Sequence, residues 1–153
     1  MNSRMPDYPE KLQDVLDQFA WITDRGERAE YLIELADRFE GVPASIAVRP
    51  YPAANHVAFC ESEAYVFAED RPDGRLKFHF AVENPQGLSA RAMAVILDQT
   101  LSGQPLEQVA AVPDDIVLTI FGRNIAMGKG QGLMGIVAMV REHAKRRLRE
   151  RQH

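Results

Sequence analysis

The sequence predicts an α+β domain, in which an antiparallel sheet of about three strands packs with amphipathic helices. Two observations predict this class, helical apolar spacing on both sides of a central segment and a strand–turn–strand pattern within that segment, and the length of 153 residues predicts one domain. Apolar residues make up 46% of the chain and charged residues 26%, which is typical of a globular protein with one core. We therefore expect a single domain over residues 1–153.

Two helices are expected before residue 41. The first follows Pro9, which suits a first helical turn, and its apolar residues share one face: Leu12, Val15, Leu16 and Phe19. The second begins with Asp24 and Glu27 as a capping pair and ends near Gly41, with an apolar face of Ala29, Leu32, Ile33, Ala36 and Phe39. Prolines at 43, 50 and 52 then predict an extended loop over 42–55.

A β-hairpin is expected next. Segments 63–69 (EAYVFAE) and 76–82 (LKFHFAV) are rich in aromatic and branched residues, and the connection DRPDG supplies Asp-Gly turn chemistry. In the second strand the residues expected to face the core are Leu76, Phe78, Phe80 and Val82. Val57 and Phe59 are interpreted as a backward extension of the first strand, which places Cys60 at the sheet edge.

The remaining segments are predicted to be helical. Helices are expected over 88–101 and 105–110, and a long helix opens near Gly130 with apolar residues through Leu148. Residues 114–121 (DDIVLTIF) fit either a buried strand or a buried helical turn, and we favour the helix.

The charge distribution argues against broad nucleic-acid binding. Net charge is −4, and the basic helix end at about 141–153 holds six of the 18 Lys and Arg residues, so the preceding 140 residues are acidic overall. We interpret this end as a solvated helix terminus whose cations suit the helix dipole. No apolar run is long enough to span a membrane and the amino end has no signal-peptide pattern, so a cytoplasmic location is expected.

Two glycine-rich segments resemble nucleotide-binding motifs without fitting them. GRNIAMGK, residues 122–129, has five residues between its glycines instead of four, and glycine follows its lysine. GQGLMG, residues 130–135, opens the last predicted helix, which leaves no second strand to complete a dinucleotide fold. We interpret Gly130, Gly132 and Gly135 as allowing close backbone approach.

Cys60 is the only cysteine, which excludes an internal disulfide. A metal site with His56 and His79 would have too few ligands, so no metal is expected. In a cysteine hydrolase either histidine could act as the base. The simplest alternative is an inert, packed thiol. Because Glu61 and Glu63 disfavour a thiolate, a reactive Cys60 requires a compensating cation or the surface of a partner protein, and Lys129 is one candidate for the cation.

Four segments, in order, resemble the SufE-like sulfur acceptors of iron-sulfur cluster assembly. ERAEYLIELADRFEGVP resembles their second helix, and VAFCES followed by an aromatic strand occupies the place of their active cysteine. ARAMAVILDQTLSGQPLEQV resembles their central helix and the start of the next, and GKGQGLMGIVAMV resembles their closing helix. The resemblance covers nearly the whole chain and implies a SufE/IscU-like fold.

The chain departs from the family pattern near the cysteine. Phe59 stands where the family usually has glycine, and Lys129 where it has arginine, which keeps the charge but loses the planar fork. Asn84-Pro85-Gln86 replaces a Ser-Asp-Ala type stretch, and Ala92 a small glycine. These changes concern partner docking more than chemistry.

The resemblance implies a sulfur relay rather than an independent enzyme. Cys60 would take persulfide sulfur from a cysteine desulfurase, stimulating it, and pass the sulfur to an iron-sulfur cluster scaffold, sheltered by a lip of Phe59 and the proline-rich loop. The carrier would hold no permanent cofactor, since pyridoxal phosphate belongs to the partner. The alternatives are a non-catalytic adaptor of the same fold that docks on a desulfurase, and a cysteine hydrolase. Whether the chain forms a homodimer stays open.

Overall fold

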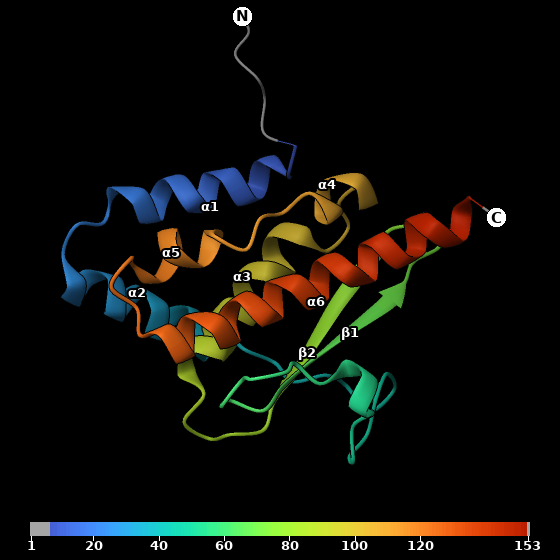
Figure 1. The fold of residues 1–153 in the computed structure, drawn as a ribbon, viewed down its shortest axis with the longest axis horizontal. Helices are drawn as coiled ribbons and strands as arrows, with labels where there is room; N and C mark the ends of the chain where they lie inside the picture. The colour runs from blue at the N-terminus through green and yellow to red at the C-terminus, as the bar shows by residue number, and fades with distance from the viewer. Residues whose placement is uncertain (1–6, 153) are drawn as a thin grey trace, which may run out of the picture.

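The computed structural model describes residues 7–152, and the outer limits of the predicted domain, 1–6 and 153, lie outside this range. Figure 1 shows a group of helices packed beside one β-hairpin, with the last helix running across the molecule. In chain order the elements are α1 (Glu10–Trp21), α2 (Arg25–Asp37), the 3-10 turn η1 (Ala53–Asn55), β1 (Ala64–Asp70), β2 (Leu76–Val82), α3 (Leu88–Leu101), α4 (Leu106–Ala110), α5 (Ile116–Phe121) and α6 (Met127–Arg151).

The N-terminal helices follow the predicted caps but not the whole predicted face. The Asp24 carboxylate accepts a hydrogen bond of 2.9 Å from the backbone N–H of Glu27, which confirms the capping pair. α2 ends at Asp37 instead of near Gly41, and its buried stripe is Leu32, Leu35 and Ala36. Ile33 is 45% exposed, so its assignment to the buried face was wrong. One residue after Leu32 lies about 100° round the helix, which turns Ile33 toward solvent.

The α+β class is confirmed, but in the described residues the sheet has two strands instead of about three. β1 and β2 pair antiparallel with Val66 opposite Phe80, and a single bridge joins His56 to Tyr65. The expected extension through Val57 and Phe59 is wrong, because the Val57 N–H bonds back to the Ala64 carbonyl at 2.9 Å. The chain therefore reverses between these two residues, and Cys60 lies in the reversing loop.

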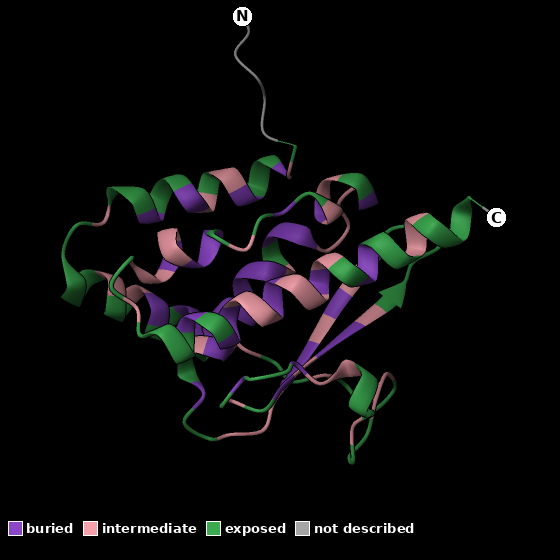
Figure 2. Cartoon of the chain, in the orientation of Figure 1, coloured by how far each residue is buried: buried purple, intermediate pink, exposed green. Residues whose placement is uncertain are grey.

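The core lies where the hairpin meets α3 and α6. Figure 2 shows α3 buried along most of its length, as expected for a helix covered on several sides. Leu76, Phe78 and Phe80 of β2 are buried as predicted, whereas Val82 is only half-buried. α3 packs against β2 and α2, and α6 packs against β1 and α4.

The basic end of α6 is largely used within the fold. Arg147 forms an ion pair of 2.7 Å with Asp70 of β1, and Arg151 donates to the carbonyl of Gly74 in the hairpin turn. α6 starts at Met127, three residues before the predicted Gly130, and residues 116–121 are helical as we favoured. Within residues 7–152, no helix is both long and apolar enough to cross a bilayer.

Candidate functional site

Cys60 lies in a tight loop over residues 57–63 between η1 and β1. One non-glycine residue on each side of Cys60 has a left-handed backbone conformation: Phe59, with φ 59°, and Glu63, with φ 52°. Left-handed conformations reverse the chain direction quickly, and they are rare for a bulky residue such as phenylalanine. The loop thus places a strained phenylalanine directly before the thiol.

Residues 84–87, the segment before α3, contact the part of this loop that follows Cys60. The backbone N–H of Asn84 donates to the Ser62 carbonyl and its side-chain amide donates to the Glu61 carbonyl, both at 3.1 Å. The Asn84 side-chain oxygen accepts from the backbone N–H of Gln86 at 2.9 Å. Asn84 therefore fixes the chain immediately after Cys60.

Helix α6 holds the first half of the loop through close backbone contact. A β-carbon added at Gly132 would lie 3.2 Å from the Cα of Cys60, and one added at Gly135 would lie 2.8 Å from a methyl group of Val57. Side chains at these positions would push the loop away from the helix. This confirms that these glycines serve close backbone approach, as interpreted from the sequence.

Cys60 is buried, with 7% of its surface exposed, yet it lines a cavity of about 200 Å³. Glu61 and Lys129, two of the predicted site residues, line the same cavity and are exposed. The other lining residues come from the loop, the segment before α3 and the start of α6: Ser62, Gln86, Gly87, Leu88, Ser89, Gly128, Gly132 and Leu133. The cavity therefore combines a thiol, a carboxylate and an ammonium group.

Phe59 and the proline-rich loop, which were expected to form an apolar lip over Cys60, do not line this cavity. Phe59 is instead 81% exposed and borders a separate groove of about 770 Å³ along α6. Met127, 88% exposed, lies on the same groove. The groove is mostly apolar and includes Leu118, Ile125, Met134 and Met139. Cys60 thus lines the smaller cavity, while its neighbour Phe59 borders the larger apolar groove.

The predicted histidines are engaged elsewhere. His56 pairs with Glu63 at 3.0 Å and His79 with Glu69 at 2.9 Å, and neither lines the Cys60 cavity. A thiol and base pair is therefore not assembled by either histidine. Within residues 7–152, no group of three or more His, Cys, Asp or Glu side chains could hold a metal ion.

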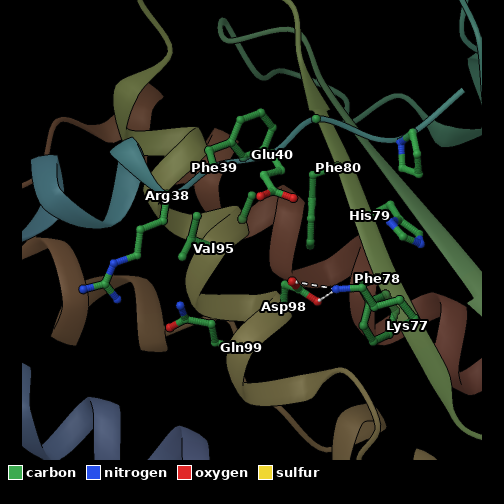
Figure 3. A pocket seen from close by; sticks show the side chains of 13 residues that line it. Arg38, Phe39, Glu40, Lys77, Phe78, His79, Phe80, Val95, Asp98 and Gln99 are labelled. Atoms are coloured by element: carbon green, nitrogen blue, oxygen red, sulfur yellow. Dashed lines mark hydrogen bonds and ion pairs between the residues drawn. The ribbon is translucent and has the colours of Figure 1, made fainter.

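A further cavity of about 400 Å³ lies between the end of α2, β2 and α3, and none of its lining residues lines the Cys60 cavity. Figure 3 shows the Lys77 ammonium pointing at the Asp98 carboxylate inside it, at 2.7 and 2.8 Å from the two oxygens. Asp98 also accepts from the Ser102 hydroxyl at 2.6 Å. This charged pair links β2 to α3, which is a structural role.

Sequence reasoning named Cys60, Glu61 and Lys129, which the structure brings to one cavity, but it did not name the segment before α3 that lines the same cavity. Nothing in the local pattern of residues 84–89 signals contact with Cys60, because the contact bridges more than twenty residues of intervening hairpin. The relevant signal was the departure from the family at Asn84-Pro85-Gln86, which marked the segment without giving its role.

The chain is similar to known proteins in sequence and in fold. Residues 13–144 match the family model described as SufE, Fe-S metabolism associated domain. The chain is 26% identical over 143 residues to uncharacterized SufE-like proteins from two strains of Mycobacterium tuberculosis, covering 93% of this chain and 94% of theirs. An uncharacterized SufE-like protein of Rhizobium etli is 25% identical over 136 residues, covering 88% of this chain and 89% of its own.

A solved structure shares the fold. The solution structure of a hypothetical protein from Thermus thermophilus superposes with a TM-score of 0.71 at 22% identity, covering 93% of this chain and 98% of that one. Because the family model spans most of the chain, this chain belongs to the SufE family of Fe-S metabolism associated domains.

Proposed function

We propose that this protein accepts one sulfur atom as a persulfide on Cys60 from a cysteine desulfurase and passes it to an iron-sulfur cluster scaffold. One observation carries the proposal: the only thiol of the chain lines a cavity, in a loop held at both ends by specific contacts. A relay needs a single transferable site, whereas a cluster scaffold needs several ligands.

The transfer is a displacement at sulfur. The Cys60 thiolate attacks the outer sulfur of the donor's persulfide, a new S–S bond forms at Cys60, the donor's own S–S bond breaks, and the donor cysteine leaves as a thiolate. The exchange has no net oxidation or reduction. Lys129 is the cation in the same cavity that offsets the nearby Glu61 carboxylate when negative charge develops on sulfur.

In this proposal the loop has two states, one in which Cys60 is buried and one in which a donor protein reaches it. With 7% exposure, the thiol is sheltered from oxidants and small thiols in the isolated chain. A donor protein must move the loop to reach the sulfur atom. The exposed Phe59 and Met127 provide apolar surface beside the loop that such a protein can cover.

The test is intact mass spectrometry after mixing with a cysteine desulfurase, pyridoxal phosphate and cysteine. We expect a gain of about 32 Da on the chain, for one added sulfur, and none on Cys60→Ser. Alkylating Cys60 beforehand should also abolish the gain. A wild-type chain that stays unmodified under conditions where the desulfurase turns over would refute the proposal.

The burial of Cys60 also favours a second candidate, a non-catalytic adaptor that regulates a desulfurase by docking alone. In that case Cys60→Ser binds the desulfurase and changes its turnover as wild type does. In the relay, Cys60→Ser keeps binding but loses the stimulation of turnover, because the sulfur has no acceptor. The comparison of binding and stimulation in one variant separates the two candidates.

A further inference from the structure

A second cavity adjoins the Cys60 cavity and is lined by cations. It has a volume of about 540 Å³ and lies between the start of α2, the end of α5 and the start of α6. Four basic residues line it, with no acidic residue among the lining: Arg25, Arg28, Arg123 and Lys129. It shares Lys129 and Ser89 with the Cys60 cavity, so the two are direct neighbours. We call it the cationic cavity.

Three of the four cations are available to a ligand. Arg25, Arg123 and Lys129 are exposed, and no hydrogen bond or ion pair joins their side chains to another residue within 7–152. Arg28 differs, because its guanidinium donates to four backbone carbonyls at the ends of α1 and α5. Arg28 therefore supports the wall of the cavity, and the other three supply its free charge.

The acidic groups close to the cavity in sequence or in space have other roles. Asp24 accepts the N–H of Glu27 at the start of α2, and neither carboxylate lines the cavity. Asp114 borders the apolar groove together with Arg123 but pairs with Arg141 at 2.6 Å. Among residues 7–152, no carboxylate therefore lies in the wall of the cavity, and the charged groups that line it are all basic.

This charge stands out against the rest of the chain. Net charge is −4, and six of the 18 basic residues lie in the last thirteen positions, so the body carries more acidic than basic groups. A concave surface with cations alone attracts anions and excludes cations. Guanidinium groups, which make up two of the three free charges, match the planar carboxylate in geometry.

We propose that the cationic cavity binds a carboxylate-bearing segment of the protein that delivers sulfur to Cys60. The inference rests on the proposed function: a donor that reaches Cys60 must also cover the neighbouring cavity that shares Lys129 and Ser89. The free cations lie on three segments, α2, the α5–α6 connection and α6, around a space of about 540 Å³. Such a space accommodates one or more side chains of a docked protein and exceeds the needs of a single small ion.

The experiment uses Arg25→Glu, Arg123→Glu and the double variant. Lys129 stays unchanged because it also lines the Cys60 cavity, and Arg28 stays because it supports the fold. Sulfur loading of Cys60 by a cysteine desulfurase is followed by intact mass over a range of acceptor concentrations. At low salt the double variant should need roughly tenfold more acceptor for half-maximal loading, each single variant less. Raising NaCl from about 0.05 to about 0.5 M should remove most of this difference by screening.

Two controls keep loss of fold apart from loss of docking. Lys145→Glu reverses an exposed charge in the C-terminal half of α6 and should load as wild type does. Alkylation of Cys60 by iodoacetamide without a desulfurase should have the same rate in the double variant as in wild type. Faster alkylation of the double variant would mean that the loop itself had changed. The charge reversals are then replaced by Arg25→Gln with Arg123→Gln, which should raise the acceptor concentration for half-maximal loading by a smaller factor.

The outcomes are distinct. If wild type loads and the double variant loads with the same concentration dependence at low salt, the inference is wrong and the proposed function stands. If wild type does not load at all, the proposed function fails and the inference fails with it. If inorganic phosphate at about 1 mM raises the melting temperature of wild type but not of the double variant, while loading is unaffected by the substitutions, the cavity is a small-anion site and not a protein-docking surface.

Discussion

Gly132 of α6 and Cys60 are in backbone contact: a β-carbon on the glycine would lie 3.2 Å from the Cα of the cysteine. The contact means that the position of the thiol depends on a residue 72 positions later in the chain. It also means that α6 can hold the loop closed only while this position lacks a side chain.

Gly132→Ala should therefore displace the loop. We expect a net loss of up to about 2 kcal/mol in the free energy of unfolding, because overpacking costs about 1 to 3 kcal/mol and helix propensity returns up to about 1 kcal/mol, together with faster alkylation of Cys60. Gly128→Ala on the same helix is the matched control, since its β-carbon would meet nothing within 4 Å. It should gain up to about 1 kcal/mol from helix propensity. Urea unfolding and iodoacetamide kinetics measure both effects, and equal behaviour of the two variants would contradict the contact.

Phe59→Gly should separate stability from docking. The left-handed φ of 59° costs a non-glycine residue about 1 to 2 kcal/mol, and the side chain is 81% exposed, so little burial is lost. Greater freedom of the unfolded chain offsets part of the relief. We expect an unfolding free energy between unchanged and about 1 kcal/mol higher, with slower loading by the desulfurase. A clear destabilisation would show instead that the phenyl ring supports the fold.

Asn84→Ala should loosen the segment after Cys60. The variant loses the hydrogen bond of 3.1 Å to the Glu61 carbonyl, at a cost of about 1 kcal/mol. We expect Cys60 to be alkylated several-fold faster. Asn84→Asp keeps the oxygen that accepts from Gln86 but loses the donor to Glu61, so it should behave like the alanine variant. An aspartate variant with wild-type alkylation would assign the effect to the turn and not to the Glu61 contact.

Arg28→Met should be strongly destabilising, because it leaves the carbonyls of Ile22, Thr119 and Ile120 without the Arg28 donor, while the Phe19 carbonyl keeps the backbone N–H of Ile22. We expect a loss of roughly 2 to 3 kcal/mol, the cost of unpaired polar groups inside the fold. Arg25→Met is the comparison on the same helix, and as an exposed substitution it should stay within about 0.5 kcal/mol of wild type. Thermal unfolding of the two variants measures the difference, and equal melting temperatures would contradict the role of Arg28.

His143 should make stability depend on pH. Burial between α6 and β1 lowers the pKa of His143, further lowered by Arg146 and Arg147, while the hydrogen bond to the Val66 carbonyl opposes the shift. The unfolded chain, with a histidine pKa of 6.5, binds a proton before the folded chain does, so stability rises with pH. The stability that depends on neutral His143 is fully present above pH 6.5. It is lost as the pH falls from 6.5 through the lower pKa of His143 in the folded chain.

The measurement is thermal unfolding at neutral pH and near pH 5.5 for wild type and His143→Gln. Glutamine keeps a donor for Val66 but does not titrate, so the variant should lose less stability on acidification than wild type. The pairs His56 with Glu63 and His79 with Glu69 are common to both proteins and cancel in the comparison. Identical pH dependence in the two proteins would exclude His143 as the titrating group.

Local patterns predicted much of the fold. The helix over 88–101 and the second strand over 76–82 begin and end where expected, because apolar spacing and the Asp-Gly turn act over a few residues. Errors arose where a local pattern met a distant contact. Val57 and Phe59 alternate like a strand, but the contact of the loop with α6 and the left-handed residue at 59 turn the chain back.

The sequence by itself determined that the chain has one thiol, that this thiol follows a phenylalanine where the family usually has glycine, and that the last helix contains Gly132 and Gly135 among its glycines. Only the tertiary structure decided that these features meet, that Asn84 fastens the loop, and that Arg25, Arg123 and Lys129 surround a cavity beside the cysteine. The physical reason is the distance along the chain over which each interaction acts. Backbone propensity and periodicity act over about four residues, whereas the site is made by packing between segments that the chain separates by dozens.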